Sequence, residues 1–331
     1  MRGSVVIIMR QNRIKCLTLA LLLCLSGCGS PGGETRGPTG GSPEGSSTVH
    51  AAAEGQKTHY EIPEFAEASF HADKATGDDN AKIDLSAVSS GYVGVSAKAD
   101  VRLKFQVIKK DKDEETYTYN LANDGTPSIF PVQSGDGVYT FRVMLNTVDT
   151  NYTVMYTTDQ EVKLEDEFQP FLRPSDYVNY SKESDCVKKA QELAENSEDA
   201  VAFVAAVFEC ICDTVTYDKE KAVQVQTKKD YLPDPDETLS TGKGICFDYA
   251  ALAAAMLRSQ GIPTKMVFGN VSPDNLYHAW NMFYTEETGW VTVDYKVKGG
   301  DWNRLDLTFS ANGADGTFIG DGGNYADVRY Y

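Results

Sequence analysis

The hydrophobic pattern of this chain changes its period once, and that change constrains the fold more than any other feature. Between about residues 58 and 164, apolar and polar residues alternate in short segments separated by turns rich in Gly, Asp and Asn. These segments are residues 92–97, 101–108, 116–121, 138–145 and 152–158. Alternation of this kind is typical of antiparallel strands. We therefore predict an all-β, sandwich-like domain over residues 58–165.

After residue 165, apolar residues recur at the spacing of helices. This spacing predicts three helices: residues 184–195, a segment that begins at Ser197 and ends near Thr214, and the Ala-rich residues 246–259. Strands are expected at 264–271, 277–284 and 290–297. The fold class is therefore α+β: the sandwich-like domain precedes a core over residues 166–331, in which helices pack on an antiparallel sheet.

The chain of 331 residues carries 31 basic and 48 acidic residues, for a formal net charge of -17. Its hydrophobic content of 41% is that of a globular protein rather than of a disordered chain. An acidic surface repels nucleic acid and anionic lipid headgroups, so we expect neither as a partner.

Residues 1–27 read as a signal peptide, because a basic stretch precedes a short apolar run. The small residues before Cys28 resemble a bacterial lipobox, which implies cleavage before Cys28 and acyl chains on that residue. The alternative is an ordinary signal peptide followed by an incidental cysteine. Residues 28–57 are rich in Gly, Ser, Pro and Thr and predict a flexible tether.

Four cysteines lie beyond this N-terminal region, at positions 186, 210, 212 and 246. They form no Cys-x-x-Cys pair, so we expect no zinc site, and no other metal or cofactor motif is present. Cys186 could form a disulfide with Cys210 or Cys212, or all three could be free thiols; the sequence leaves both open.

Cys246 follows a Gly-Lys-Gly stretch and begins the Ala-rich helix, which Gly261 and Pro263 end. The N-terminus of a helix carries about half a positive charge and presents free N–H groups. Both features favour a thiolate and an oxyanion. From this stretch alone, a buried structural cysteine is an equal alternative.

His278 and Asp294 lie in the two expected strands that follow, and their separation of 16 positions is even. A hairpin that folds back near Glu286 would therefore place both side chains on one face, opposite each other. An aspartate beside a histidine fixes its tautomer and stabilises the imidazolium. Together with Cys246, the pair would form a Cys/His/Asp relay.

Three motifs of this chain resemble those of the transglutaminase-like superfamily of papain-like cysteine enzymes. They are the Gly-x-Cys at a helix start, the His-Ala-Trp at 278–280 and the Trp-x-x-x-Asp at 290–294. The resemblance covers about residues 170–306. It implies that Cys246 is the nucleophile, His278 the general acid and base, and Asp294 the orienting acid. The sandwich region and the lipobox are similar to those of Gram-positive surface lipoproteins, which implies an extracytoplasmic protein anchored to the cell membrane.

Further roles are less determined by the sequence. Tyr217 is our candidate for the side chain that helps the Cys246 N–H bind an oxyanion; the alternative is a core aromatic. Trp280 and Trp290 could wall the cleft or lie in the core. Residues 231–243 could form a lid or an inert loop.

The function that we expect is attack on a peptide or amide carbonyl to give a thioester, which water resolves more readily than an amine. The substrate would be a peptide or protein, such as a cell-wall peptide. One alternative is a catalytically idle transglutaminase-like module that binds or adheres at the surface. Another is a thiol that forms a covalent self-linkage.

Overall fold

The computed structural model describes residues 59–331, except for 111–114, 229, 274, 288, 293–294 and 314–321. The side chains of residues 289–292 and 295–297 also lie outside the described part of the chain. The expected signal peptide and tether, including Cys28, precede residue 59 and are therefore not described. The described residues belong to one compact unit.

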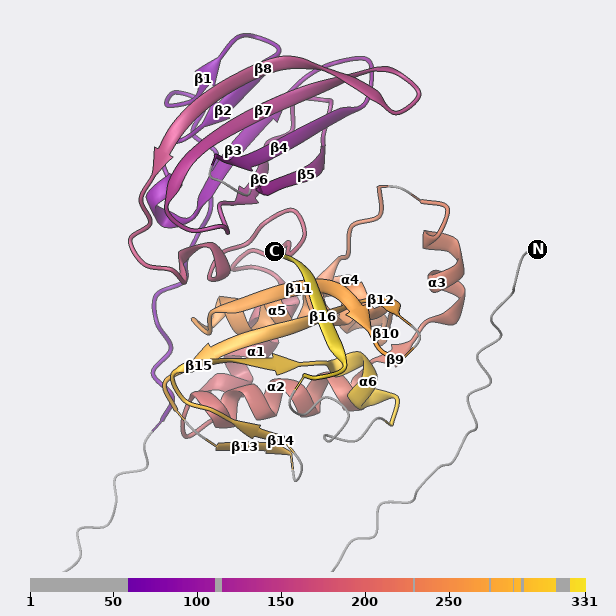
Figure 1. The fold of residues 1–331 in the computed structure, drawn as a ribbon. Coiled ribbons are helices and arrows are strands. Elements are labelled where there is room, and N and C mark those ends of the chain that lie inside the picture. The colour runs from indigo at the N-terminus through magenta and orange to yellow at the C-terminus, as the bar shows by residue number, and fades with distance from the viewer. Residues whose placement is uncertain are drawn as a thin grey trace, which may run out of the picture. The chain divides into compact units, whose positions relative to one another are not determined.

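Two four-stranded antiparallel sheets form the first half of this unit (Figure 1). The first sheet has the order β1 (Thr76–Gly77), β2 (Ala81–Asp84), β3 (Tyr92–Ala97), β6 (Ser128–Pro131). The second has the order β5 (Glu115–Leu121), β4 (Leu103–Lys109), β7 (Gly137–Val148), β8 (Asn151–Val162). One hydrophobic cluster contains residues of both sheets, and Phe105 of β4 stacks on Phe130 of β6 at 4.9 Å between ring centroids. The prediction of an N-terminal β-sandwich is confirmed.

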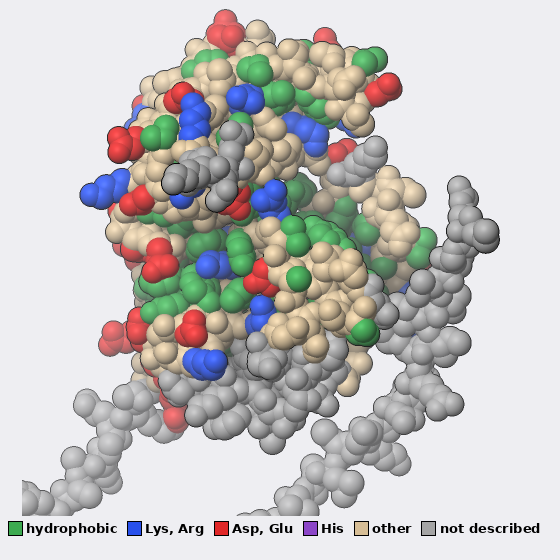
Figure 2. Space-filling model, viewed as in Figure 1, with side chains coloured by type: hydrophobic (Ala, Val, Ile, Leu, Met, Phe, Trp, Pro, Cys, Tyr) green, Lys and Arg blue, Asp and Glu red, His purple; other side chains and the backbone are tan. Residues whose placement is uncertain are grey.

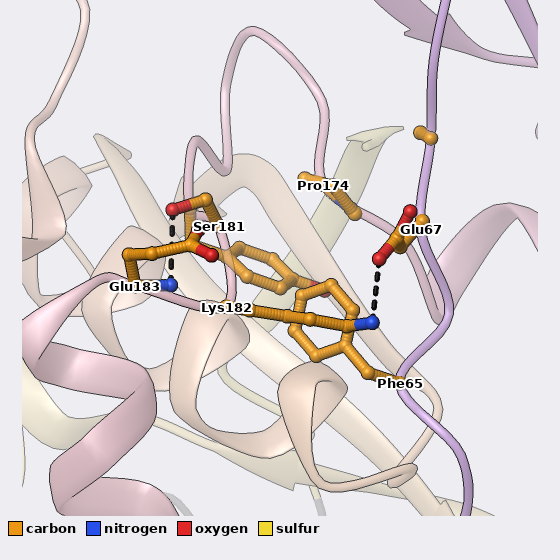
Figure 3. A pocket seen from close by; sticks show the side chains of 8 residues that line it. Phe65, Glu67, Pro174, Ser181, Lys182 and Glu183 are labelled. Atoms are coloured by element: carbon orange, nitrogen blue, oxygen red, sulfur yellow. Dashed lines mark hydrogen bonds and ion pairs between the residues drawn. The ribbon is translucent and has the colours of Figure 1, made fainter.

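Part of the stretch before the first strand packs on the helical half of the chain, whereas the backbone N–H groups of Ser69 and His71 donate to Tyr92 and Asp84 of the sandwich. Tyr60 stacks on Phe203 at 5.5 Å, and its backbone N–H donates to the carbonyl of Ser197. Figure 3 shows a neighbouring pocket of about 230 Å³, in which Lys182 pairs with Glu67 at 2.5 Å. Residues 60–67 therefore tie the start of the sandwich half to the core.

The second half contains one four-stranded antiparallel sheet in the order β15 (Asp301–Leu305), β12 (Leu276–Thr285), β11 (Thr264–Val271), β16 (Tyr325–Tyr330). Helices α1 (Asp185–Glu195), α2 (Ala200–Thr214) and α5 (Cys246–Ser259) lie on one face of this sheet (Figure 1). The side chains of α5 from Asp248 onward are buried, because small Ala residues let α1, α2, β11 and β12 pack closely around it. The predicted α+β core of helices on an antiparallel sheet is confirmed.

Shorter elements complete the core. They are η1 (Val88–Ser90), η2 (Gln169–Phe171), β9 (Thr216–Tyr217), α3 (Lys219–Val225), α4 (Pro235–Thr241), β10 (Lys243–Gly244), β13 (Gly289–Thr292), β14 (Tyr295–Val297) and α6 (Leu307–Ala311). Helix α4 lies within the stretch for which we considered a lid or an inert loop. The carboxylate of Asp236 in α4 accepts hydrogen bonds from the backbone of Asp185 and Cys186, at 3.1 and 2.8 Å. That part of the stretch is therefore fixed on α1.

Two expectations about the core need correction, and one alternative that the sequence left open is decided. Strand β12 pairs with β15, not with residues 290–297, and β13 pairs with β14 instead. The N-cap of α2 is Asp199, whose side chain accepts from the N–H of Ala202, and not Ser197. All four described cysteines are free, so neither Cys186–Cys210 nor Cys186–Cys212 is a disulfide.

No helix among the described residues is long and apolar enough to cross a membrane.

Candidate active site

Cys246 is the first residue of α5 and is half-buried. The backbone enters the helix through β10, which runs parallel to β9 and pairs Gly244 with Tyr217. A side chain at position 244 would collide with the Cβ of Asp248 at 2.7 Å, so this approach requires glycine. The thiol therefore lies beside the N–H groups and positive dipole end of α5.

His278 lies in β12 and is only 4% exposed. Its imidazole stacks on the ring of Phe309 with a centroid distance of 4.4 Å, and on Trp280 at 6.1 Å. The Asn281 amide in the same strand donates to the carbonyl of Ala250 in α5 at 3.0 Å. This bond fixes the strand that carries His278 against the helix that carries Cys246.

Asp306 is the carboxylate that contacts His278. Its Oδ2 lies 2.9 Å from Nε2 of His278 and accepts a hydrogen bond from the Tyr325 hydroxyl at 3.0 Å. Its Oδ1 accepts from the N–H of Phe309 at 3.0 Å, because Asp306 is the N-cap of α6. A carboxylate that is buried and held by three donors can orient the imidazole rigidly.

The charges around His278 favour its protonated form. Burial alone would lower the pKa of His278, but the charge and hydrogen bond of Asp306, together with the interaction with Cys246, raise the pKa to about 10. Because Nε2 is engaged by Asp306, Nδ1 is the ring nitrogen that can exchange a proton with the Cys246 thiol. The arrangement places a protonated imidazole between a buried carboxylate and the side chain of Cys246.

The sequence prediction for the third residue was Asp294, which lies outside the described residues. The structure therefore does not test that role directly, although the hairpin on which we based it does not form. Sequence reasoning missed Asp306. The one local signal was an aspartate before the apolar residues of α6, a pattern of helix N-caps that carries no information about His278.

Tyr217 lies near the thiol. It pairs with Gly244, two residues before Cys246, and its pKa is raised by burial and by the charges of Cys246 and Asp248. Trp280 is 1% exposed and packs with Val267, Val271 and Tyr325, so it lies in the core behind His278. The side chain of Trp290 lies outside the described residues.

A second carboxylate, Asp248, is fully buried and lies two residues after Cys246 in α5. It accepts from the N–H of Ile245 at 2.8 Å, pairs with Lys221 at 3.0 Å and accepts from the Tyr231 hydroxyl. The Tyr231 ring also contacts Phe247, with 6.2 Å between centroids. Asp248 thus fastens α3 and the residues after it to the start of the nucleophile helix.

Residues 187–295 match the family model of the Transglutaminase-like superfamily. This segment contains Cys246 and His278 and ends before Asp306. This part of the chain is therefore similar to the transglutaminase-like superfamily, as its motifs predicted.

An uncharacterized protein of Mycobacterium leprae (strain TN) is 28% identical over 158 residues, which cover 43% of this chain and 50% of that protein. The chain thus matches half the length of this relative.

Several solved structures resemble the fold. A proposed cysteine protease from Cytophaga hutchinsonii has a TM-score of 0.36 and 16% identity, covering 78% of this chain and 90% of that one. Legionella pneumophila LapG, treated with EGTA, has a TM-score of 0.31 and 16% identity, covering 44% and 68%. Red sea bream transglutaminase has a TM-score of 0.27 and 13% identity, covering 66% and 48%. At these values the similarities do not bear on activity.

Proposed function

We propose that this chain is a cysteine-dependent acyl-transfer enzyme that acts on peptide or amide bonds, with hydrolysis favoured over transfer to an amine. The observation that carries the proposal is the alignment of Cys246, His278 and Asp306. A thiol at a helix N-terminus influences the protonation of a buried imidazole, whose Nε2 is held by a buried carboxylate. A purely structural core has no need of a buried histidine paired with a carboxylate and a thiol.

In the proposed first step, the Cys246 thiolate attacks the carbonyl carbon, a C–S bond forms, and the carbonyl electrons move to the oxygen. The N–H of Cys246 stabilises this oxyanion, with the Tyr217 hydroxyl as the candidate second donor. The imidazolium of His278 gives its proton to the nitrogen as the C–N bond breaks. The amine leaves, and a thioester remains on Cys246.

In the second step, His278 accepts a proton from water as the water oxygen attacks the thioester carbonyl. Collapse of this second tetrahedral species breaks the C–S bond, releases the carboxylic acid and restores the thiolate–imidazolium pair. An amine in place of water would give a new amide. Asp306 stabilises the imidazolium in both steps and keeps the ring in position.

We further propose that the protein acts outside the cytoplasm, anchored by lipid at Cys28, and that residues 28–57 form its tether. This proposal rests on the N-terminal sequence alone.

The test of the activity compares wild type with Cys246→Ala and Cys246→Ser on dimethylated casein and a dansylated amine. New termini report hydrolysis, and incorporated dansyl groups report transfer. We expect both variants to lose all activity. Activity that Cys246→Ala leaves unchanged would contradict the proposal.

A further inference from the structure

A groove lies between the β-sandwich and the segment that joins α3 to α4. We name it the interdomain groove and define it by Asn120, Asn123, Asn179, Asp230 and Leu232, which line a cavity of about 510 Å³. A neighbouring cavity of about 660 Å³ shares Arg102, Asp230 and Leu232 with it. In Figure 2 the surface is hollowed between the sandwich and the α3 segment, with hydrophobic side chains inside the hollow.

This groove is connected to the candidate active site through Tyr231. Asp230 and Leu232 flank Tyr231, whose hydroxyl donates to Asp248 and whose ring contacts Phe247, the residue after Cys246. The ring of Phe247 also contacts Tyr177, which follows the groove residue Asp176 in the chain. Aromatic side chains thus lead from the first turn of α5 to the groove.

The lining of the groove has the chemistry of a polypeptide site. The amide of Asn179 and the hydroxyl of Thr126 can both donate and accept, which suits the N–H and C=O groups of a peptide backbone. The amides of Asn120 and Asn123 also line the groove, where Asn120 accepts from Lys104 at 3.3 Å and Asn123 donates to the carbonyl of Val101 at 3.1 Å. Leu232, which is 43% exposed, adds aliphatic surface for a side chain. Acidic and basic groups both occur, so the groove does not select an anion.

We propose that the interdomain groove binds an extended segment of the polypeptide substrate, a few residues from the carbonyl that Cys246 attacks. The β-sandwich then forms a wall of the substrate site instead of acting only as a spacer. An extended chain advances about 3.3 Å per residue, so each added residue lets a bound substrate reach further from the thiol towards the groove. The inference rests on the proposed function, because it assumes that Cys246 reacts with the substrate.

The test measures alkylation of Cys246 by electrophiles with and without a peptide. One series attaches an iodoacetyl group to the N-terminus of Ala-rich peptides of one to six residues, and the second carries a chloromethyl ketone at the C-terminus. In at least one series, we expect the six-residue peptide to alkylate Cys246 about tenfold faster than the one-residue compound, because the groove adds binding energy. Peptide mass spectrometry identifies the labelled cysteine.

Variants locate the source of this gain. Leu232→Arg and Asn179→Arg place a long charged side chain in the groove at exposed positions, so the fold should tolerate them. We expect each to remove most of the gain with length and to leave the iodoacetamide rate unchanged. Val154→Arg is the matched control, because Val154 is 47% exposed, close to the 43% of Leu232, but lies in β8 at the opposite edge of the sheet from β5.

Two failures are distinguishable. A reactive Cys246 with no gain for longer peptides, or a gain that both groove variants retain, overturns the groove and leaves the proposed function intact. A Cys246 that iodoacetamide labels no faster than a free thiol overturns the proposed function, and the groove as a substrate site with it.

Discussion

Nε2 of His278 and Oδ2 of Asp306 lie 2.9 Å apart, although 28 positions separate the two residues in the chain. Strand β15 brings them together, because it pairs with β12 and ends one residue before Asp306. The N-cap bond to Phe309 and the hydroxyl of Tyr325 then hold the carboxylate in place. The imidazole is therefore oriented by residues from three separate elements.

Replacement of Asp306 by Asn should lower kcat/KM by about a hundredfold or more, because the neutral amide neither stabilises the imidazolium nor fixes the tautomer. Asn can still cap α6, so the fold should persist. Circular dichroism would check this, and casein turnover would give the rate.

Asp294→Asn is the matched control for that prediction, since Asp294 is the acid that the sequence motif favoured. We expect the larger loss of activity in Asp306→Asn. If Asp294→Asn abolished activity while Asp306→Asn had little effect, the orienting acid would be Asp294.

The protonation of His278 should persist to alkaline pH. Its folded pKa of about 10 lies above the ordinary value of 6.5, so the folded state binds this proton more tightly than the unfolded state does. The resulting stabilisation is complete below pH 6.5 and is lost as the pH rises through about 10. Hydrolysis should also decline above about pH 10, because the general acid disappears. Titration of ¹³C-labelled histidine, assigned with His278→Gln, measures this directly; a midpoint near 6.5 would refute it.

Asp248 should stabilise the start of the nucleophile helix. Asp248→Ala removes the partner of Lys221 and Tyr231 and leaves the Ile245 N–H without its acceptor, at a cost of about 2–4 kcal/mol in the free energy of unfolding. Urea denaturation gives this value, and limited proteolysis should reveal faster cleavage between residues 226 and 234.

The control for Asp248 is Asp185→Ala, which breaks an exposed pair with Lys188 and should cost no more than about 1 kcal/mol. If both variants lost the same small amount of unfolding free energy, the buried pair would contribute no more to stability than the exposed pair does.

The mature N-terminus should be an acylated Cys28. Acyl chains contribute about 0.8 kcal/mol for each buried methylene, so two or more would retain the protein in the membrane fraction. Cys28→Ala should release it to the soluble fraction with its fold unchanged. An unmodified peptide spanning residue 28 in the wild type would contradict this expectation.

Strong local signals made much of the fold predictable from the sequence. The Ala-rich run and Gly261 predicted α5 with the bounds Cys246–Ser259 that the structure has, and alternation predicted β3 as Tyr92–Ala97. The pairing of β12 was not predictable in the same way. Residues 290–297 alternate well enough to suit a hairpin, and the choice of β15 instead depends on long-range packing.

The residues of the candidate site were also only partly predictable from the sequence. Cys246 and His278 were identified because each lies in a recognisable motif on a predicted element. Asp306 and the Lys221–Asp248–Tyr231 cluster were not, because their partners lie 28, 27 and 17 positions apart and no periodicity connects them. Only the folded arrangement of β15, α3 and α5 brings these groups together.

The central claim is that Cys246 is a thiolate activated by His278, and the rate of its alkylation by iodoacetamide as a function of pH tests this most directly. The account predicts rapid, selective labelling of Cys246 below pH 7 in the wild type, and loss of that reactivity in His278→Ala. Slow labelling in both proteins, rising only near the ordinary thiol pKa of about 8.5, would contradict it.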